Sequence, residues 1–290
     1  MNDLVIHQTG RRDAEPLTMR TLLICHECAH LDRDGLARWL ASFSDLVGII
    51  VLRETKQRMW RRIKREVNRV GILRFPDVLA FRFYYRLFLS SRDRRWQEEK
   101  LAELCRAYPL LGDVPVLYTH SPNAPEAEAF IRERGPDIMI ARCKTLLRES
   151  IFSLPAHGTF VMHPGICPEY RNAHGCFWAM ANGELDKVGM TLLRIDRGVD
   201  TGPVYGYYYY QGDAAMDSHI VIQHRVVFDH LKELEQKLVD IYAGSAIPLD
   251  TAGRTSSTWG QPWLTKYWHW KLRIRGTKNA SNYAHVSRRG

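Results

Sequence analysis

His163 and Asp200 are the two side chains in this sequence whose types and positions suit proton-transfer chemistry. His163 follows a short apolar run, Thr159 to Met162, that is typical of a buried strand, and the Pro164-Gly165 pair after it breaks the strand. Asp200 lies in a loop after a second predicted strand, Val188 to Ile195. A neutral imidazole can polarise a carbonyl or accept a proton, and a carboxylate beside it orients the ring and favours its charged form. We therefore expect the two side chains to meet at one end of a sheet.

The elements that must position this pair follow an alternating pattern. Short apolar runs alternate with helical patterns, which predicts an α/β fold with a doubly wound, mostly parallel sheet. We expect helices over Thr145 to Leu154 and Ala173 to Asn182, and one long helix over Ser218 to Tyr242 that ends at Gly244. The further predicted strands are Thr21–Cys25, Leu46–Leu52, Val114–Thr119, Asp137–Ala141 and Val204–Gln211.

The chain of 290 residues is long enough to bury a full core and divides by composition. Residues 1–18 read as a flexible N-terminal tail, residues 19–245 as the α/β domain, and residues 246–290 as a basic, Trp-rich extension. Within the domain, residues 54–107 interrupt the alternation as a basic helical insertion, in which Trp60, Ile63, Val67 and Val70 recur at helical spacing. The extension is expected to fold over its own domain or over a partner subunit, which leaves a homodimer open.

Positive charge is concentrated in the two appended segments. The net charge is +9, and residues 53–100 hold fifteen Lys or Arg against six Asp or Glu, while residues 247–290 hold eight against one. One interpretation is that the basic helices pack on the edge of the sheet and leave a solvated cationic face, and the alternative is a site for an anionic ligand. There is no apolar run long enough to span a membrane and no signal peptide, so we expect a cytoplasmic protein with no membrane contact.

The stretch around His163 and Asp200 carries a series of short motifs in order. They are HPG at residues 163–165, PEYR at 168–171, HG at 174–175, WA at 178–179 and GVDTG at 198–202. In order and spacing they resemble the signature of the folate-dependent formyltransferases, which include the glycinamide ribonucleotide, methionyl-tRNA and sugar-amine N-formyltransferases. The resemblance is dense from about Ile138 to Val204, weaker over Leu22 to Leu52, and absent at both ends.

The resemblance implies a Rossmann-type fold, 10-formyltetrahydrofolate as formyl donor, and a catalytic set of Asn, His and Asp. His163 and Asp200 match the His and the Asp, but the Asn position, two residues before the His, is Val161. In the family that amide holds the formyl oxygen, and removing one donor of this kind costs roughly 10²–10³ in rate. Asn172, His174 or a backbone N–H would have to replace it.

The resemblance also implies two binding surfaces. Donor-binding residues would come from the segments 142–147 and 197–202, with Val161 between them: Arg142, Cys143, Leu146, Val161, Val199 and Asp200. The amine acceptor would enter beside Tyr170, Arg171, Asn172 and His174, where Arg171 is either a phosphate-binding or a loop-stabilising residue. No metal is expected, because the single pair Cys25 and Cys28 lacks a second pair at finger spacing.

These observations favour transfer of a formyl group to a primary amine on a small molecule, an amino sugar or a nucleotide-linked amine. Because of Val161, a binding protein with weakened catalysis and a formyltetrahydrofolate hydrolase remain alternatives. A nucleic-acid-binding protein that uses the basic helices is a further alternative.

Overall fold

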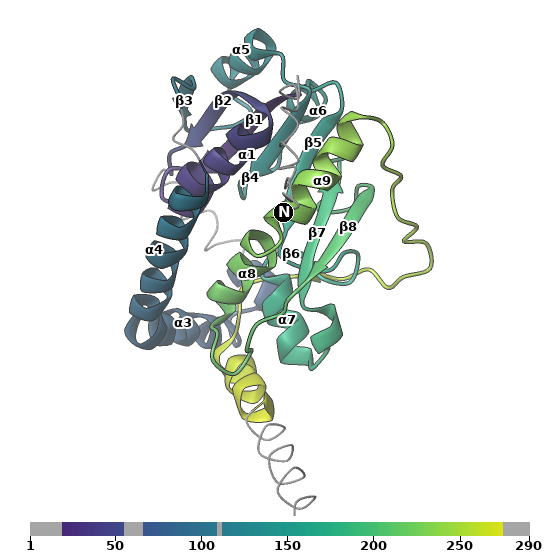
Figure 1. Ribbon diagram of the computed structural model, residues 1–290. Coiled ribbons are helices and arrows are strands. Elements are labelled where there is room, and N and C mark those ends of the chain that lie inside the picture. The colour runs from purple at the N-terminus through teal and green to yellow at the C-terminus, as the bar shows by residue number, and fades with distance from the viewer. Residues whose placement is uncertain (1–18, 55–65, 109–111, 275–290) are drawn as a thin grey trace, which may run out of the picture.

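The computed structural model describes residues 19–54, 66–108 and 112–274. Its main sheet has seven strands in the order β3-β2-β1-β4-β5-β7-β8 (Figure 1). The five strands from β3 to β5 in this order are parallel to one another, and β7 is antiparallel to both of its neighbours, β5 and β8. This confirms the predicted doubly wound, mostly parallel sheet. The strands are β1 (Arg20–His26), β2 (Asp45–Leu52), β3 (Val116–Thr119), β4 (Ile138–Arg142), β5 (Gly158–His163), β7 (Gly189–Arg194) and β8 (Val204–Tyr209), and β6 (Arg171–Asn172) pairs with β9 (Thr258–Trp259) in a separate small sheet.

Helices cover both faces of the main sheet, and α1 and α9 cross in front of the strands in the view of Figure 1. The helices are η1 (Leu31–Leu36), α1 (Ala37–Phe43), α3 (Phe75–Tyr84), η2 (Tyr85–Leu89), α4 (Ser90–Ala107), α5 (Pro125–Arg134), α6 (Glu149–Phe152), α7 (Gly175–Asn182), η3 (Leu185–Lys187), α8 (His219–Phe228) and α9 (Leu231–Tyr242). Residues 66–70 and 264–274 are also helical. No helix in the described ranges is both long and apolar enough to cross a membrane.

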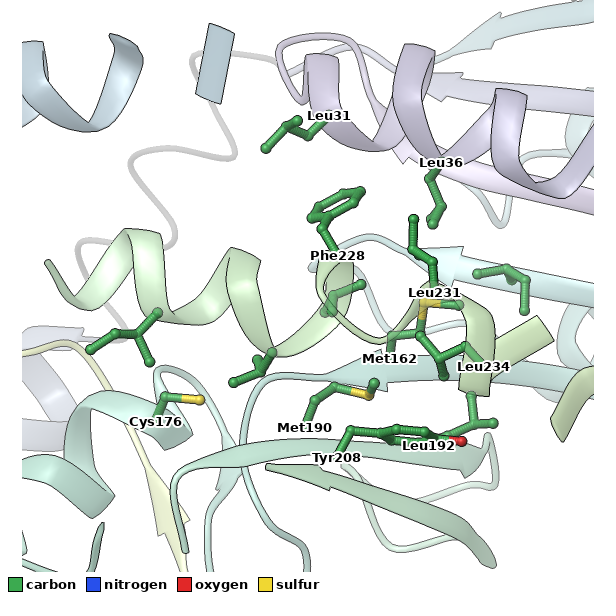
Figure 2. Packing of buried hydrophobic residues seen from close by; sticks show 14 of the residues in the cluster. Leu31, Leu36, Met162, Cys176, Met190, Leu192, Tyr208, Phe228, Leu231 and Leu234 are labelled. Atoms are coloured by element: carbon green, nitrogen blue, oxygen red, sulfur yellow. The ribbon is translucent and has the colours of Figure 1, made fainter. Parts of the chain in front are cut away.

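The alternation of side chains along the central strands divides the core between the two faces. In β1, Leu23 and Cys25 join the cluster with α1, α8 and α9, whereas Leu22 and Ile24 join the cluster with α5 and α6. Figure 2 shows the first cluster, in which Phe228 and Leu231 of the two helices lie close to Met162, Met190 and Leu192 of the strands. Because the strands are apolar on both faces, they form the rigid layer that carries the site.

The parallel strands β4 and β5 separate toward one end, and this creates space for a cavity. Their pairing runs from Ile138 with Gly158 to Ile140 with Phe160, and β5 then continues to His163 beside β7 alone. Phe160 and Met162 belong to the cluster with α8 and α9. Val161 and His163 therefore project from the opposite face of the strand.

Two predicted helices differ from the structure. The long helix is wrong as a single element, because it stops at Phe228 and restarts at Leu231, with His230 at φ −120° and ψ 22° outside helical geometry. His230 is buried, and its ring lies 5.7 Å from that of Tyr208, so tertiary packing places the break where the sequence has neither Gly nor Pro. The helix predicted over Thr145 to Leu154 is reduced to α6, and the non-helical segment before it, including Thr145, Leu146 and Leu147, lines the cavity.

The two basic appended segments lie against each other. Gln261 N donates to Glu66 Oε1 at 3.3 Å, and Thr265 N donates to Asp77 Oδ1 at 3.1 Å, so the extension binds the insertion in two places. Tyr267 and Trp270 of the extension are buried in the main cluster. The tail at residues 1–18, the part of the predicted basic helix that contains Trp60 and Ile63, and residues 275–290 lie outside the described residues.

Candidate active site

The His163 imidazole and the Asp200 carboxylate are in contact. His163 Nδ1 lies 3.5 Å from Asp200 Oδ2, and both side chains are largely buried. His163 is the last residue of β5, whereas the strand that precedes Asp200, β7, ends at the opposite end of β5. Since β7 is antiparallel to β5, its carboxyl end lies beside Phe160, at the start of β5. The loop of residues 195–203 therefore runs back along β5 to bring Asp200 to the imidazole.

The loop that carries Asp200 is fixed by its own side chains and by one unusual backbone angle. Asp196 Oδ1 accepts hydrogen bonds from Gly198 N at 2.9 Å and from Thr201 Oγ1 at 2.7 Å. Asp200 itself has φ 51°, in the left-handed region that costs energy for most residues. Its Oδ2 also accepts from Asn172 N at 2.8 Å, so two groups orient the carboxylate.

The second ring nitrogen of His163 is bound to the backbone. Its Nε2 lies 2.8 Å from the carbonyl oxygen of Tyr170. A carbonyl only accepts hydrogen bonds, so Nε2 carries a proton, and when the ring is neutral its lone pair is on Nδ1, the nitrogen that faces Asp200. When Nδ1 takes up a proton, it gains the Asp200 carboxylate as acceptor. The arrangement suits a group that receives a proton from a reacting amine.

Close backbone packing holds this geometry in place. A Cβ built on Gly165 would lie 2.3 Å from Tyr170 O and 2.7 Å from His163 Nε2, and one on Gly175 would lie 2.5 Å from the Cα of Gly165. Only glycine permits the turn after β5 to approach the start of α7 this closely. The HPG and HG motifs are thus two sides of one contact.

A pocket that is open to solvent lies beside Asp200 where β4 and β5 separate. Among the expected donor-binding residues, Cys143, Leu146, Val161 and Asp200 line it. Several other residues also line the cavity. Some of them fall in the two segments predicted to bind the donor. Leu193 reaches the cavity because it pairs with Val161 across β5 and β7. These other lining residues are Ala141, Thr145, Leu147, Leu193, Ile195, Asp196, Arg197 and Gly198.

Arg142 and Val199 are placed differently from the other four. The Arg142 guanidinium donates to Asp32 Oδ1 at 3.0 Å and to Met162 O at 2.6 Å, in a buried ion pair away from the cavity lining. Val199 uses its carbonyl oxygen, which accepts from Arg171 Nη1 at 3.0 Å. Arg171 therefore stabilises the loop of Asp200 in this structure, which is the second of the two roles considered for it.

Val161 leaves the cavity without the amide that the family pattern has at this position. Its side chain packs beside Cys167, Leu193 and Val204 and offers no donor. The expected substitutes are engaged elsewhere. Asn172 Nδ2 donates to Trp259 O at 2.5 Å and Asn172 N donates to Asp200, while His174 Nδ1 lies 2.9 Å from Gln223 Nε2.

Two of the expected acceptor-binding side chains are committed to packing or are kept neutral. The Tyr170 ring is buried, its hydroxyl donates to Glu184 Oε2 at 3.0 Å, and burial raises the pKa of Tyr170 to about 12. His174 begins α7 with φ 56°. Burial of its ring, and next the charges of Lys144 and Arg82, lower the pKa of His174 to about 3. His174 is therefore neutral and sits in a positive potential.

Cys25 and Cys28 lie in different surroundings. Cys25 is buried and Cys28 is exposed, and burial raises the pKa of the Cys25 thiol. Across the described ranges, no group of three or more His, Cys, Asp or Glu side chains is placed to hold an ion.

Comparisons with known proteins agree with this geometry. Residues 91–234 match the formyl transferase family. The chain is 29% identical to the methionyl-tRNA formyltransferase of Thermotoga neapolitana over 62% of its own length and 49% of that protein, and 38% identical to that of Geobacter metallireducens over 31% and 29%. It thus spans about half the length, or less, of these relatives.

Among solved structures, the fold is similar to phosphoribosylglycinamide formyltransferase from Anaplasma phagocytophilum, with a TM-score of 0.51 and 12% identity over 84% of this chain and all of that one. At this identity the likeness concerns the fold alone. The match of residues 91–234 and the relatives named above show that this part of the chain is a formyl transferase domain, and it contains the HPG, HG and GVDTG motifs that meet around His163 and Asp200.

Proposed function

We propose that this protein transfers a formyl group from 10-formyltetrahydrofolate to the primary amine of a small anionic molecule, such as an amino sugar or a nucleotide-linked amine. The observation that carries the proposal is the contact of His163 Nδ1 with Asp200 Oδ2, 3.5 Å apart, at the rim of a cavity. The formyl transferase domain supports the reaction class. The identity of the acceptor rests on the charges around the site.

In this proposal His163 moves the proton that the amine must lose. The lone pair on Nδ1 accepts it, and the imidazolium that results is stabilised on both sides, by Asp200 at Nδ1 and by the Tyr170 carbonyl at Nε2. Positioned acid–base groups of this kind contribute on the order of 10²–10⁴ in rate. The dry surroundings of the two side chains strengthen the attraction between them.

The cavity suits the flat ring system of a folate. Its walls combine apolar side chains, from Leu146, Leu147, Val161, Leu193 and Ile195, with a comparable share of polar surface that includes the 196–200 loop. Ligand pockets commonly combine apolar walls with a few polar groups that fix orientation. When bound, the donor would supply the formyl group and the tetrahydrofolate leaving group. The residues of the chain would hold the formyl group beside His163.

An anionic acceptor is supported by the positive charges that surround His174. Lys144, Arg82 and Arg69 come from three separate segments, and the charge of each adds to the lowering of the pKa of His174, of which burial is the largest cause. Lys144 also acts on His224 of α8. A phosphate or carboxylate group on the acceptor would be attracted to this cluster, and its amine would then face the buried pair.

The experiment that tests the proposal is a screen of primary amines with formyl-labelled donor. Each amine is offered with and without a phosphate or nucleotide group, and both formylated amine and released tetrahydrofolate are measured. We expect product with at least one phosphorylated amine, a higher KM for its neutral counterpart, and loss of product in His163→Ala. Neutral amines used equally well would contradict an anionic acceptor.

Val161 specifically favours a second candidate, a protein of the same fold that hydrolyses the donor or only binds it. Water needs less positioning than an amine, and without the family amide the formyl oxygen is less polarised in this site. Release of tetrahydrofolate without any formylated amine would support hydrolysis. Tight binding of the donor analogue with neither product would support the binding role.

A further inference from the structure

We propose that Trp259, in the C-terminal extension, is a positioning residue for the catalytic pair: strand β9 holds the segment of residues 169–173 in the conformation that fixes both His163 and Asp200. This inference rests on the proposed function. It concerns a part of the chain outside the family match at residues 91–234, so it assigns a role at the site to a segment that the family comparison does not cover.

Trp259 contacts the segment of residues 169–173 through its ring and through its backbone. Its Nε1 donates to Glu169 O at 2.8 Å, and its carbonyl oxygen accepts from Asn172 Nδ2 at 2.5 Å. The indole stacks on the Tyr170 ring at 5.5 Å between centroids, and on the Trp178 ring at 4.9 Å. The indole thus lies between the 169–173 segment and helix α7.

The backbone of the extension pairs with the same segment. β9 runs parallel to β6, with Thr258 opposite Arg171 and Trp259 opposite Asn172. Arg171 N donates to Ser257 O at 3.1 Å, and Ser257 N donates to Pro168 O at 3.1 Å. Hydrogen bonds on both sides of Arg171 therefore define where the segment lies.

The segment held in this way contacts both members of the catalytic pair through its backbone. Tyr170 O is the partner of His163 Nε2 at 2.8 Å, and Asn172 N donates to Asp200 Oδ2 at 2.8 Å. Since the Tyr170 carbonyl sets the tautomer of His163, its position decides whether Nδ1 has a lone pair to receive a proton. If the segment moves, the proton can pass to Nδ1 instead, where Asp200 would accept it.

The extension is itself anchored at the far side of β9. The carbonyl oxygen of Gly260 accepts from Trp178 Nε1 at 2.9 Å, and the guanidinium of Arg69 occupies the space where a side chain at Gly260 would stand. With the bonds from Gln261 and Thr265 to the insertion, β9 is held between the catalytic domain and the helical insertion. A strand held from both sides can impose its position on the loop.

The test compares Trp259→Ala, Trp259→Phe and Trp268→Ala in the full chain. Trp268 is a matched control from the same extension, about half exposed, with its ring edge-on to Tyr84 at 6.1 Å and no contact with the 169–173 segment that the structure records. Single-turnover rate and KM report on function, and ¹⁵N spectra of labelled histidine report the tautomer of His163, assigned by its loss in His163→Gln. Thermal melts establish that each variant is folded.

We expect Trp259→Ala to lower the single-turnover rate on the order of 10²-fold, the size of effect known for a misplaced catalytic geometry, with KM for the donor nearly unchanged. His163 should change from a single Nε2–H tautomer to a mixture with Nδ1–H. Trp259→Phe keeps the stacking and loses the bond to Glu169 O, so it should fall between wild type and Trp259→Ala. Trp268→Ala should match wild type in rate and tautomer.

Two results would overturn the proposal. One is a folded Trp259→Ala with wild-type rate and tautomer, and the other is a Trp259→Ala that unfolds while Trp259→Phe keeps both at wild-type values, because the residue would then support the fold alone. If wild type formylates no amine, the proposed function fails, but the tautomer spectra still decide the role of Trp259.

Discussion

The ring nitrogen Nε2 of His163 lies 2.8 Å from the carbonyl oxygen of Tyr170, seven residues further along the chain. This one bond connects the turn after β5 to the chemistry of the site, because it places a proton on Nε2, the ring nitrogen that faces away from Asp200. The hydrogen bond from Asn172 N to Asp200 comes from the same segment. The segment of residues 169–173 therefore contacts both members of the proposed catalytic pair through its backbone.

Restoring the family amide should increase activity. Val161 lines the cavity from the same face of β5 as His163, so Val161→Asn is expected to place a donor near the formyl oxygen. The single-turnover rate should then rise by up to about 10²–10³-fold, the range known for one oxyanion donor. Val161→Leu is the control, since it adds volume without a donor. A rate in Val161→Asn no higher than in Val161→Leu would mean that another group already does this work.

The contact between the two glycine motifs should be intolerant of a single methyl group. Gly165→Ala brings a Cβ within 2.3 Å of Tyr170 O, so we expect a loss of about 1–3 kcal/mol of unfolding free energy together with a fall in activity. Gly112→Ala, where a Cβ would meet nothing within 4 Å, should leave both unchanged. Denaturant unfolding measures the difference, and equal stability of the two variants would contradict the packing described.

Stability should fall as the pH drops below neutral, because several histidines are buried in neutral form. Burial is the main cause that lowers the pKa of His224 to about 4 and of His174 to about 3, and burial also lowers the pKa of His219. The unfolded chain takes up these protons near pH 6.5, so the contribution is complete above that pH and is lost progressively as the pH falls toward the folded pKa values.

The measurement is unfolding free energy between pH 7 and pH 4. His224→Gln should flatten the slope, because the unfolded chain then binds one proton fewer, and His120→Gln, at an exposed position, should leave it as in wild type. A slope in His224→Gln identical to wild type would show that His224 is protonated in the folded protein.

The fold and the contact between His163 and Asp200 could be predicted because local patterns carry them. The apolar runs at Leu46 to Leu52 and Ile138 to Ala141 mark buried parallel strands, and the motifs around His163 and Asp200 identify the pair. The break at His230 could not be predicted, since it depends on packing against Tyr208 and not on a helix-breaking residue. The residues that line the cavity from β7 depend on its antiparallel direction, which a strand pattern does not reveal.

The role of the extension was the least predictable feature. Asn172 and Trp259 are 87 positions apart, and their pairing in a two-residue parallel sheet leaves no periodic signal in either segment. The tryptophans of the extension do indicate burial, but not the partner. Only the folded arrangement shows that one of them lies against the segment that contacts His163 and Asp200.

A double-mutant cycle on the single-turnover formylation rate tests the central claim most directly. Asp200→Asn is suited to it because Asn tolerates the left-handed φ of 51° at this position. If His163 and Asp200 act as one unit, His163→Ala and the double variant His163→Ala/Asp200→Asn should have the same rate, on the order of 10²–10⁴ below wild type. Losses that multiply across the cycle would show that the two residues act independently and would contradict the account.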